Sequence, residues 1–391
     1  MGEVDPAFIQ PIEHRPKLKP IEVGDEIPVL DLSNVILNSH NSTSQQLISE
    51  IGSACQSWGF FQVVNHGVPA ELRRKVEAVA KKFFAGSLEE KRKVKRDALN
   101  AMGYHDSEHT KNIRDWKEVF DFLAHDPTAV PASHEPDDEG IRILTNQWPL
   151  YPTELSLPPV LQCTGAVASV TCVQFWSRAR IAAAPVLTIP SKYSWLDLCE
   201  EYGREVEKLA FKLLELISLS LGLPANRMNG YFEDQTTFLR FNHYPPCPSP
   251  NLALGVGRHK DGGALSVLAQ DDVGGLEVRR KSDGEWIPVK PIPDAYIINV
   301  GDAVQVWSND KYESVEHRVV VNSTKARLSI PFFFFPAHYT MVKPLEELVN
   351  EQNPAKYKEF NWGKFVANRN RSDFKKQDVE NIQIYHFRIS K

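Results

Sequence analysis

Cysteine is scarce in this sequence: there are five cysteines among 391 residues, an odd number, and no CxxC pair occurs. This set argues against a disulfide framework or a zinc site and favours a reducing compartment, so we expect a cytoplasmic protein. An apolar leader is also lacking, because the first residues, Met1 to Asp5, are largely acidic or small. We therefore expect no signal peptide.

An excess of basic residues is missing too. The chain has 45 Lys and Arg against 50 Asp and Glu, a formal net charge of −5, and no long basic run. This balance argues against a general nucleic-acid-binding protein. A hydrophobic content of 42% is that of a globular protein, and the length allows a large core. We expect a monomer that acts on a small molecule, away from membranes.

Acidic residues disappear between Glu154 and Asp197, although the flanks on both sides have ordinary compositions. The segment 155–195 shows no steady helical or strand period, and we interpret it as an atypical insertion of about forty residues. A retained intron translated in frame is our hypothesis for its origin. The uncharged run from Pro158 to Ser177 has about the length of a membrane span, but its Pro, Gln, Ser and Thr content makes it a poor one.

Short strand-like runs separated by turns fill the second half of the chain. They alternate or bury apolar residues, and no helical pattern lies between them, so they predict an antiparallel double sheet of jelly-roll type. The expected fold is mixed α+β, with a double-stranded β-helix (jelly-roll) core flanked by N- and C-terminal helices. Helices are predicted at 44–58, 69–84 and 196–221, and strands at 27–32, 60–64, 237–244, 264–268, 296–300, 304–307 and 314–321.

Two histidines and an aspartate stand out within these strands. On a strand, side chains i and i+2 leave the same face, so His259 and Asp261 can hold one cation together. His317 follows 56 residues after Asp261 in another strand-like run, and a double sheet can bring it across. Two imidazoles and one carboxylate are the ligands of non-haem Fe(II) oxygenases, and they leave three coordination positions open. We therefore predict an Fe²⁺ site.

Arg327 and Ser329 repeat the i, i+2 spacing after His317. A guanidinium grips a carboxylate through two parallel hydrogen bonds, so a diacid could be held by iron at one end and by arginine at the other. Each pair alone is weak evidence, but their order along the chain favours this reading. Two alternatives stay open: a jelly roll that binds metal without catalysis, and a once-active enzyme disabled by the 155–195 segment.

These residues give the sequence a resemblance to the plant soluble dioxygenases that depend on 2-oxoglutarate and Fe(II), such as flavonol synthase, anthocyanidin synthase and gibberellin oxidase. The matching motifs are His259-x-Asp261, His317 and Arg327-x-Ser329, together with Arg240 to Cys247 and Trp58 to Gly67. The resemblance implies Fe²⁺, 2-oxoglutarate and O₂, with ascorbate as a candidate reductant. It also implies that Asn242 and Tyr244 lie near the 2-oxoglutarate. Lys260 departs from the Thr or Ser that many relatives carry there.

The expected reaction is hydroxylation, desaturation or demethylation of a small plant metabolite such as a flavonoid, a hormone or another specialised compound. Candidate substrate contacts are Tyr104, Phe122, Phe333 and Phe335, and a role in the core is an alternative for each. The expected organisation is an N-terminal extension (1–26), an N-terminal dioxygenase region (27–154), the insertion (155–195), a support helix (196–235), the dioxygenase core (236–338) and a C-terminal helical region (339–391).

Overall fold

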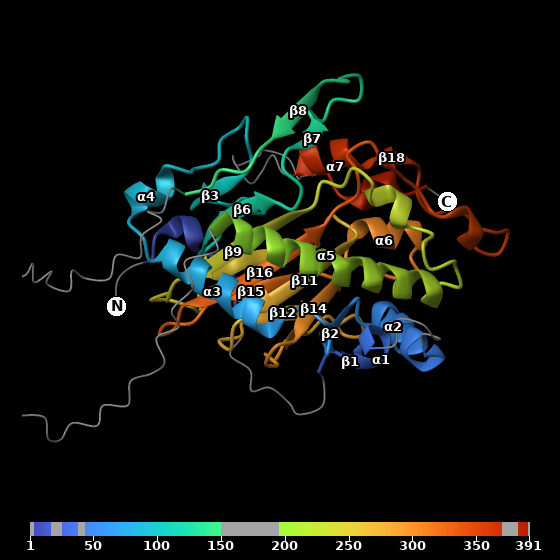
Figure 1. Ribbon diagram of the computed structural model, residues 1–391, viewed down its shortest axis with the longest axis horizontal. Helices are drawn as coiled ribbons and strands as arrows, with labels where there is room; N and C mark the ends of the chain where they lie inside the picture. The colour runs from blue at the N-terminus through green and yellow to red at the C-terminus, as the bar shows by residue number, and fades with distance from the viewer. Residues whose placement is uncertain (1–3, 17–25, 38–43, 150–194, 370–381, 390–391) are drawn as a thin grey trace, which may run out of the picture.

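The computed structural model describes residues 4–16, 26–37, 44–149, 195–369 and 382–389. The insertion predicted at 155–195, with its membrane-span alternative, lies outside the described residues apart from Trp195. The described chain is built on two β-sheets with helices on the outside (Figure 1).

The larger sheet has eight strands in the order β1-β2-β14-β11-β16-β9-β6-β3 and the smaller one has four in the order β10-β15-β12-β13. All neighbours pair antiparallel except β1 and β2. The larger sheet consists of β1 (Val29–Asp31), β2 (Phe60–Val64), β14 (Tyr296–Val300), β11 (Leu265–Gln270), β16 (Arg327–Phe334), β9 (Phe238–Tyr244), β6 (Glu118–Leu123) and β3 (Gly103–His105). The smaller sheet consists of β10 (Leu254–His259), β15 (His317–Val320), β12 (Leu276–Arg279) and β13 (Trp286–Pro288).

The inner faces of the two sheets share one apolar cluster. Val256 and Val319 of the smaller sheet pack with Tyr244, Leu268 and Ile297 of the larger one. Because alternate side chains of each strand enter this cluster, the facing sheets form the predicted jelly roll, and polar side chains at its mouth can meet across the barrel.

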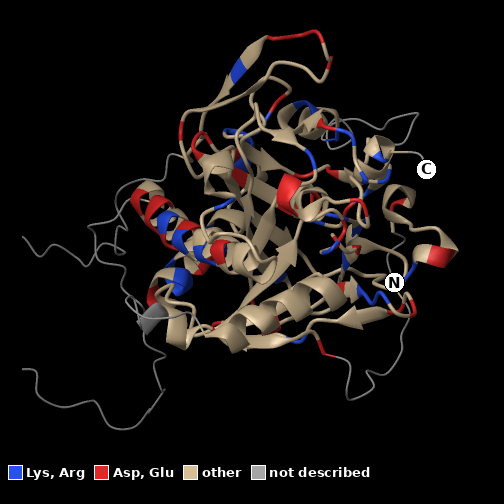
Figure 2. Cartoon of the chain, turned by 90° about the vertical axis from the view of Figure 1, so that its right-hand side faces the viewer, with Lys and Arg blue, Asp and Glu red and all other residues tan. Residues whose placement is uncertain are grey.

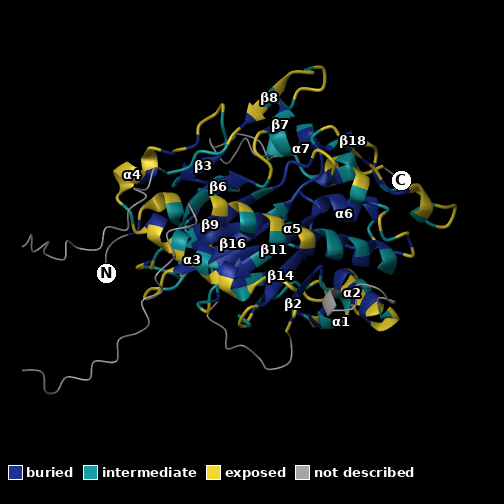
Figure 3. Cartoon of the chain, in the orientation of Figure 1, coloured by how far each residue is buried: buried dark blue, intermediate teal, exposed yellow. Residues whose placement is uncertain are grey.

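Helices cover the outer face of the larger sheet (Figures 1 and 3). The longest, α5 (Trp195–Ser220), contacts β11 and β16, while α2 (Gln45–Ser57) and α3 (Ala70–Phe84) pack beside it. Leu209, Leu213 and Leu216 recur at helical spacing and are buried, at about 1.5 to 3 kcal/mol for each leucine. Gly222 then adopts a φ of +83°, which favours glycine and ends the helical path. This helix confirms the one predicted at 196–221.

Shorter elements complete the described chain. Their bounds are α1 (Ser33–Leu37), α4 (Leu88–Arg92), α6 (Asp302–Trp307), α7 (Trp362–Arg369), β4 (His109–Thr110), β5 (Ile113–Arg114), β7 (Thr128–Pro131), β8 (Ile141–Leu144), β17 (Met341–Val342) and β18 (Phe360–Asn361), with 3₁₀ turns at Pro6–Phe8, Ile12–His14, Asn229–Phe232, Glu346–Leu348 and Ile384–Phe387. Of these, α6 and α7 border the site described below.

Two of the predicted elements are wrong in kind. The run 304–307, predicted as a strand, belongs to helix α6, so a helix does interrupt the strands. All six residues of α6 are buried, and a short run buried on every side has no period that separates helix from strand. The C-terminal region, predicted as helical after Pro344, contains the short strand β18 as well as α7 in its described part.

Acidic and basic residues are intermingled along the chain in Figure 2, in keeping with the small net charge. Among the described residues, no helix has the length and apolarity that crossing a bilayer requires.

Candidate metal centre and substrate cavity

His259, Asp261 and His317 meet at the mouth of the barrel. Asp261 Oδ1 lies 3.5 Å from His259 Nε2 and 3.5 Å from His317 Nε2, and the two imidazole centroids are 4.2 Å apart. Three ligands on one octahedral face of a first-row metal, each about 2.1 Å from it, are separated by about 3 Å. Among the described residues this is the one group of three or more His, Cys, Asp or Glu with such spacing.

Hydrogen bonds orient both imidazoles toward a shared point. His259 Nδ1 lies 2.9 Å from the Gly257 carbonyl oxygen, and His317 Nδ1 lies 3.2 Å from that of Val315. A carbonyl only accepts, so each Nδ1 carries the proton and each Nε2 keeps its lone pair for a cation. Burial and then the neighbouring His259 lower the pKa of His317 to about 4, which favours the neutral ring.

The carboxylate of Asp261 is fixed from the opposite side. Ser266 Oγ and Asn299 Nδ2 both donate to Asp261 Oδ2, each at 2.6 Å, so Oδ1 is the oxygen that faces the imidazoles. Burial alone raises the pKa of the Asp261 carboxyl, but His317, His259 and the Ser266 hydroxyl outweigh burial and hold that pKa well below its usual range. The site thus offers two neutral nitrogen donors and one anionic oxygen.

Asp261 reaches the two histidines in a different way from the one predicted. His259 is the last residue of β10 and pairs with His317 of β15, but Asp261 lies in the loop that follows. The i, i+2 argument from a continuous strand is therefore wrong for Asp261. Its side chain joins the histidines because the loop and its hydrogen bonds place it there.

Arg327, Ser329, Asn242 and Tyr244 also gather inside the barrel. Ser329 pairs in register with Asn242 and with Gln270, and Arg327 pairs with Tyr244. Arg327 donates to Ser329 Oγ and Gln270 Oε1, both at 3.0 Å, and its guanidinium lies 5.0 Å from the centre of the Tyr244 ring. The four predicted residues are thus adjacent, although Arg327 and Tyr244 line a small cavity of about 150 Å³ that is separate from the larger one at the metal centre.

Arg327 is a buried cation with an exposed fraction of 3%, and the side chains that accept its hydrogen bonds in the described part of the chain, Ser329 and Gln270, are neutral. Its Nε, the Oδ1 of Asn242 and the Nε2 of Gln270 are buried without a hydrogen-bond partner. Buried unpaired charge and unsatisfied polar atoms are costly, so this cluster is suited to an anionic, polar guest.

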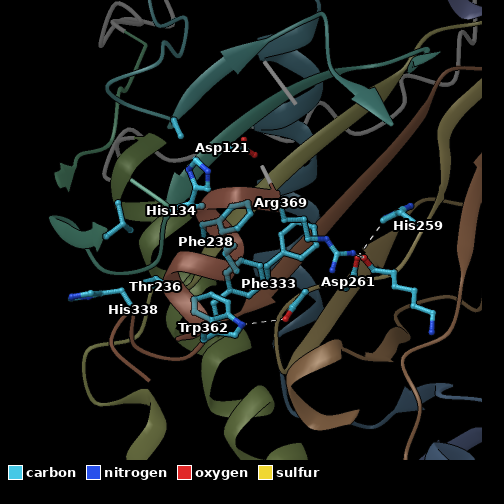
Figure 4. A pocket seen from close by; sticks show the side chains of 18 of the residues that line it. Asp121, His134, Thr236, Phe238, His259, Asp261, Phe333, His338, Trp362 and Arg369 are labelled. Atoms are coloured by element: carbon cyan, nitrogen blue, oxygen red, sulfur yellow. Dashed lines mark hydrogen bonds and ion pairs between the residues drawn. The ribbon is translucent and has the colours of Figure 1, made fainter. Parts of the chain in front are cut away.

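The large cavity, of about 950 Å³, begins at His259 and Asp261. One wall is aromatic: Phe238, Phe333, Phe335 and Trp362 line it (Figure 4). Phe333 and Phe335, predicted as substrate contacts, therefore do face the cavity.

Tyr104 and Phe122, also predicted as candidate substrate contacts, lie elsewhere, because neither side chain lines this cavity. Both have exposed fractions of 1% and belong to the main apolar core. The Tyr104 hydroxyl donates to Glu118, and the Phe122 ring packs edge-on against Phe241. Alternation along β3 and β6 turns these two rings to the helix-covered face, so substrate contact is replaced by a packing role.

Next to the aromatic residues the cavity wall is ionic, and the Arg240 guanidinium lies 6.0 Å from the centre of the Phe238 ring. Arg240 forms two hydrogen bonds to the Asp121 carboxylate, at 2.6 and 2.8 Å, and Arg96 and Lys117 contact Glu108 at 2.6 and 2.8 Å. Arg96 also reaches Asp121, Arg240 reaches Glu108, and Lys117 reaches Asp115. Three cations and three carboxylates are therefore paired in one network whose formal charges cancel.

Several residues of the site were missed by sequence reasoning. Asn299 and Gln270 hold Asp261 and Arg327, and the ionic wall comes largely from segments before β9. A detectable signal existed for Asn299, since it is the one amide in the apolar run Tyr296 to Val300. No local pattern marks the ionic wall, because its members converge only through the fold.

Comparison with known proteins agrees with this geometry. Residues 235–336 match a family model described as the 2OG-Fe(II) oxygenase superfamily, and residues 27–150 match the N-terminal region of a non-haem dioxygenase in morphine synthesis. Jasmonate-induced oxygenase 4 of Arabidopsis thaliana is 35% identical over 359 residues, covering 90% of this chain and 84% of that protein. Oxoglutarate-dependent flavonoid 7-O-demethylase 1 of Ocimum basilicum is 31% identical over 336 residues, covering 85% and 75%.

A solved structure of JOX2 in complex with 2OG, Fe and JA superimposes with a TM-score of 0.69 at 30% identity, covering 94% of this chain and 89% of that one. The named relatives are oxygenases and a demethylase, so nothing in them supports the alternatives of a disabled enzyme or a non-catalytic metal-binding jelly roll. The fold, the convergent histidines and aspartate, and these relatives lead to one assignment: the chain belongs to the plant 2-oxoglutarate- and Fe(II)-dependent dioxygenases.

Proposed function

We propose that His259, Asp261 and His317 hold the Fe²⁺ of this dioxygenase. The observation that carries the assignment is the convergence of three donor atoms whose remaining atoms are already engaged: both Nδ1 atoms contact backbone carbonyls and Asp261 Oδ2 accepts two hydrogen bonds. Only Nε2, Nε2 and Oδ1 remain for a cation, and these atoms suit iron in its ferrous state.

Arg327, Ser329, Tyr244 and Asn242 bind 2-oxoglutarate in this proposal. Charge supports a diacid: the metal, Asp261 and Arg327 sum to +2 with neutral histidines, and a doubly charged anion brings the assembly to neutrality. The guanidinium would hold the distal carboxylate, Ser329 would add a hydroxyl contact, and the unpartnered Asn242 oxygen would accept from a neighbouring donor or water.

When bound, iron and 2-oxoglutarate supply the oxidising power, with O₂ as oxidant and succinate and CO₂ as co-products. The chain's own groups act by placement. Asp261 and the two imidazoles fix one face of the metal, Arg327 seats the diacid, and the aromatic wall excludes water and orients the substrate carbon toward the open face.

The substrate we propose is a ring-containing, largely apolar metabolite with neutral oxygen functions, such as a flavonoid or a hormone of that character. The aromatic wall of Phe238, Phe333, Phe335 and Trp362 suits flat rings. The ionic wall gives hydrogen-bond partners for hydroxyl or carbonyl groups, and its three cations are already paired with three carboxylates, so this wall favours a neutral oxygen group over a carboxylate. Other basic residues, among them Lys111 and Lys260, line the cavity outside this wall.

Measuring succinate release tests both the proposed reaction and the proposed class of substrate. Purified protein with Fe²⁺, 2-oxoglutarate, O₂ and ascorbate would be offered a panel of neutral flavonoids and, as the contrasting set, jasmonic acid and other carboxylic acids. We expect neutral ring compounds to stimulate succinate formation at least tenfold more than the acids. Stimulation by acids alone would overturn the substrate class, and the absence of 2-oxoglutarate binding would overturn the function itself.

We further propose that the protein acts as a monomer in the cytoplasm. Three described cysteines, Cys55, Cys199 and Cys247, are buried free thiols, as expected for a reducing compartment. Light scattering of the purified protein and fractionation of plant cells would test the two statements separately.

A further inference from the structure

The loop that carries Asp261 is held from outside along its whole length. Five successive backbone carbonyls, those of residues 260 to 264, each accept a hydrogen bond from another element. Such loops normally leave most carbonyls to water, so this degree of engagement sets the metal loop, defined here as residues 260–264, apart.

Three of these bonds come from the start of helix α6. The N–H groups of Asp302, Ala303 and Gly301 donate to the carbonyls of Asp261 (2.8 Å), Gly263 (3.0 Å) and Ala264 (2.9 Å). The approach is so close that a Cβ on Gly301 would stand 2.2 Å from the Gly263 carbonyl oxygen. Glycine is therefore required at 301, and the first turn of α6 forms the floor of the metal loop.

The other two bonds come from side chains of α7, about a hundred residues later in the chain. Trp362 Nε1 donates to the Gly262 carbonyl at 3.2 Å, and a guanidinium N–H of Arg369 donates to the Lys260 carbonyl. A Cβ on Gly262 would lie 3.6 Å from the Arg369 guanidinium and 3.8 Å from the Phe365 ring, so α7 rests directly on the loop.

Arg369 also joins the two helices. Its second nitrogen forms an ion pair with Asp302 Oδ2, and the exposed fractions of the two side chains are 15% and 1%. One guanidinium thus connects α7, the Lys260 carbonyl, which lies between His259 and Asp261, and the helix whose N–H groups support Asp261. Figure 4 shows Arg369 close to Asp261.

We propose that Arg369 and Trp362 are positioning residues, through which helix α7 holds the metal loop in the shape that metal binding needs. The inference rests on the proposed role of Asp261 as a metal ligand. Asp261 is outside regular structure, so its carboxylate direction depends on the backbone at 260–262 as much as on Ser266 and Asn299. Trp362 and Arg369 also line the substrate cavity, so a substrate that packs on α7 stabilises the metal loop as well.

Metal affinity measured without turnover tests this role. Mn²⁺ would be titrated calorimetrically into the full-length protein and into Arg369→Gln, Arg369→Lys and Trp362→Phe. We expect Arg369→Gln to weaken Mn²⁺ binding roughly 10- to 100-fold, as is typical when a group that orients a ligand is removed. Arg369→Lys keeps a cation beside Asp302 but cannot also donate to the Lys260 carbonyl, so its Mn²⁺ affinity should fall less than that of Arg369→Gln. Trp362→Phe deletes the N–H that reaches the Gly262 carbonyl and replaces the indole by a smaller aromatic ring.

The matched control is Arg227→Gln, which removes another Arg–carboxylate pair, with Glu347, on the surface. It should leave Mn²⁺ affinity within twofold. Hydrogen exchange gives a second readout: the amides of 301–303 should exchange faster in Arg369→Gln and unchanged in Arg227→Gln, since those amides donate to the loop.

The outcomes separate this inference from the proposed function. If His317→Ala abolishes Mn²⁺ binding while both Arg369→Gln and Trp362→Phe bind as the wild type does, the positioning role is overturned and the metal site stands. If the wild type itself does not bind Mn²⁺, the proposed function fails first. Should Arg369→Gln not fold, Arg369→Lys and Trp362→Phe decide the question, and a normal affinity in both contradicts the inference.

Discussion

Replacing Arg327 by glutamine separates a binding role from a structural one. In the absence of an anion, Arg327 is a buried cation whose described partners, Ser329, Gln270 and the Tyr244 ring, are all neutral. A guanidinium that grips a carboxylate makes two charge-assisted hydrogen bonds, each contributing about 1.5 to 3 kcal/mol. Their loss should cost about 3 kcal/mol or more, which corresponds to a roughly 100-fold or greater rise in the Kd for 2-oxoglutarate.

The free energy of unfolding of Arg327→Gln should change much less than its affinity for 2-oxoglutarate. Removing a cation that forms a buried ion pair with a carboxylate typically destabilises a protein by roughly 3–5 kcal/mol, because the carboxylate is left unpaired. Here the described hydrogen-bond partners, Ser329 and Gln270, are neutral, and the substitution also removes a buried charge. We therefore expect the free energy of unfolding without 2-oxoglutarate to stay within about 1 kcal/mol of the wild-type value.

The assay is calorimetric titration of 2-oxoglutarate into the Mn²⁺-loaded protein, with urea unfolding of the same samples. Arg327→Lys serves as the matched variant: it keeps the charge and loses the fork, so its Kd should rise roughly tenfold. A 2-oxoglutarate affinity within threefold of wild type for Arg327→Gln, or a loss of several kcal/mol in its stability alone, would refute the reasoning.

Three further substitutions follow from the same contacts. Asn299→Ala removes one of two donors to Asp261 Oδ2 and should weaken Mn²⁺ binding roughly 10- to 100-fold in calorimetry, whereas the exposed Asn350→Ala should not. Burial and then Arg96 lower the pKa of His105 from its ordinary value of 6.5 to about 4, so between these two pH values the unfolded chain binds more protons than the folded chain. The free energy of unfolding should therefore rise with pH between 4 and 6.5. In urea unfolding, His105→Gln should reduce this rise by about 1 to 3 kcal/mol. Leu213→Ala opens a cavity between α5 and the sheet and should lower the free energy of unfolding by about 2 to 5 kcal/mol without changing metal affinity; an unchanged stability would contradict the packing described.

Much of the fold was predictable because its strands and helices carry strong periods. The strand 60–64 and the helices near 44–58, 69–84 and 196–221 appear where the pattern predicted them. The buried run 304–307 was not predictable by the same means, since a segment apolar on every side fits either a strand or a helix. Its helical form depends on the close contact between Gly301 and the metal loop, which is a tertiary property.

Some residues of the candidate site could likewise be predicted from the sequence, and others could not. His259, Asp261 and His317 were predictable because metal ligands are restricted to a few residue types, and their order and spacing are informative. Tyr104 and Phe122 were candidate substrate contacts with a core role as the alternative, and the pleat turns both side chains into the core. Arg369 carried no signal, because its partners Lys260 and Asp302 lie far from it in sequence and meet it only in the folded chain.

Anaerobic equilibrium binding of Fe²⁺ to the wild-type protein and to His259→Ala, Asp261→Ala and His317→Ala tests the central claim most directly. The three donor atoms around Asp261 Oδ1 predict one tightly bound ion per chain and a large loss of affinity in every variant, while His66→Gln, at a histidine that contacts the Asp294 carbonyl instead, should keep the ion. Retention of stoichiometric Fe²⁺ by any of the three alanine variants at wild-type affinity would contradict the account.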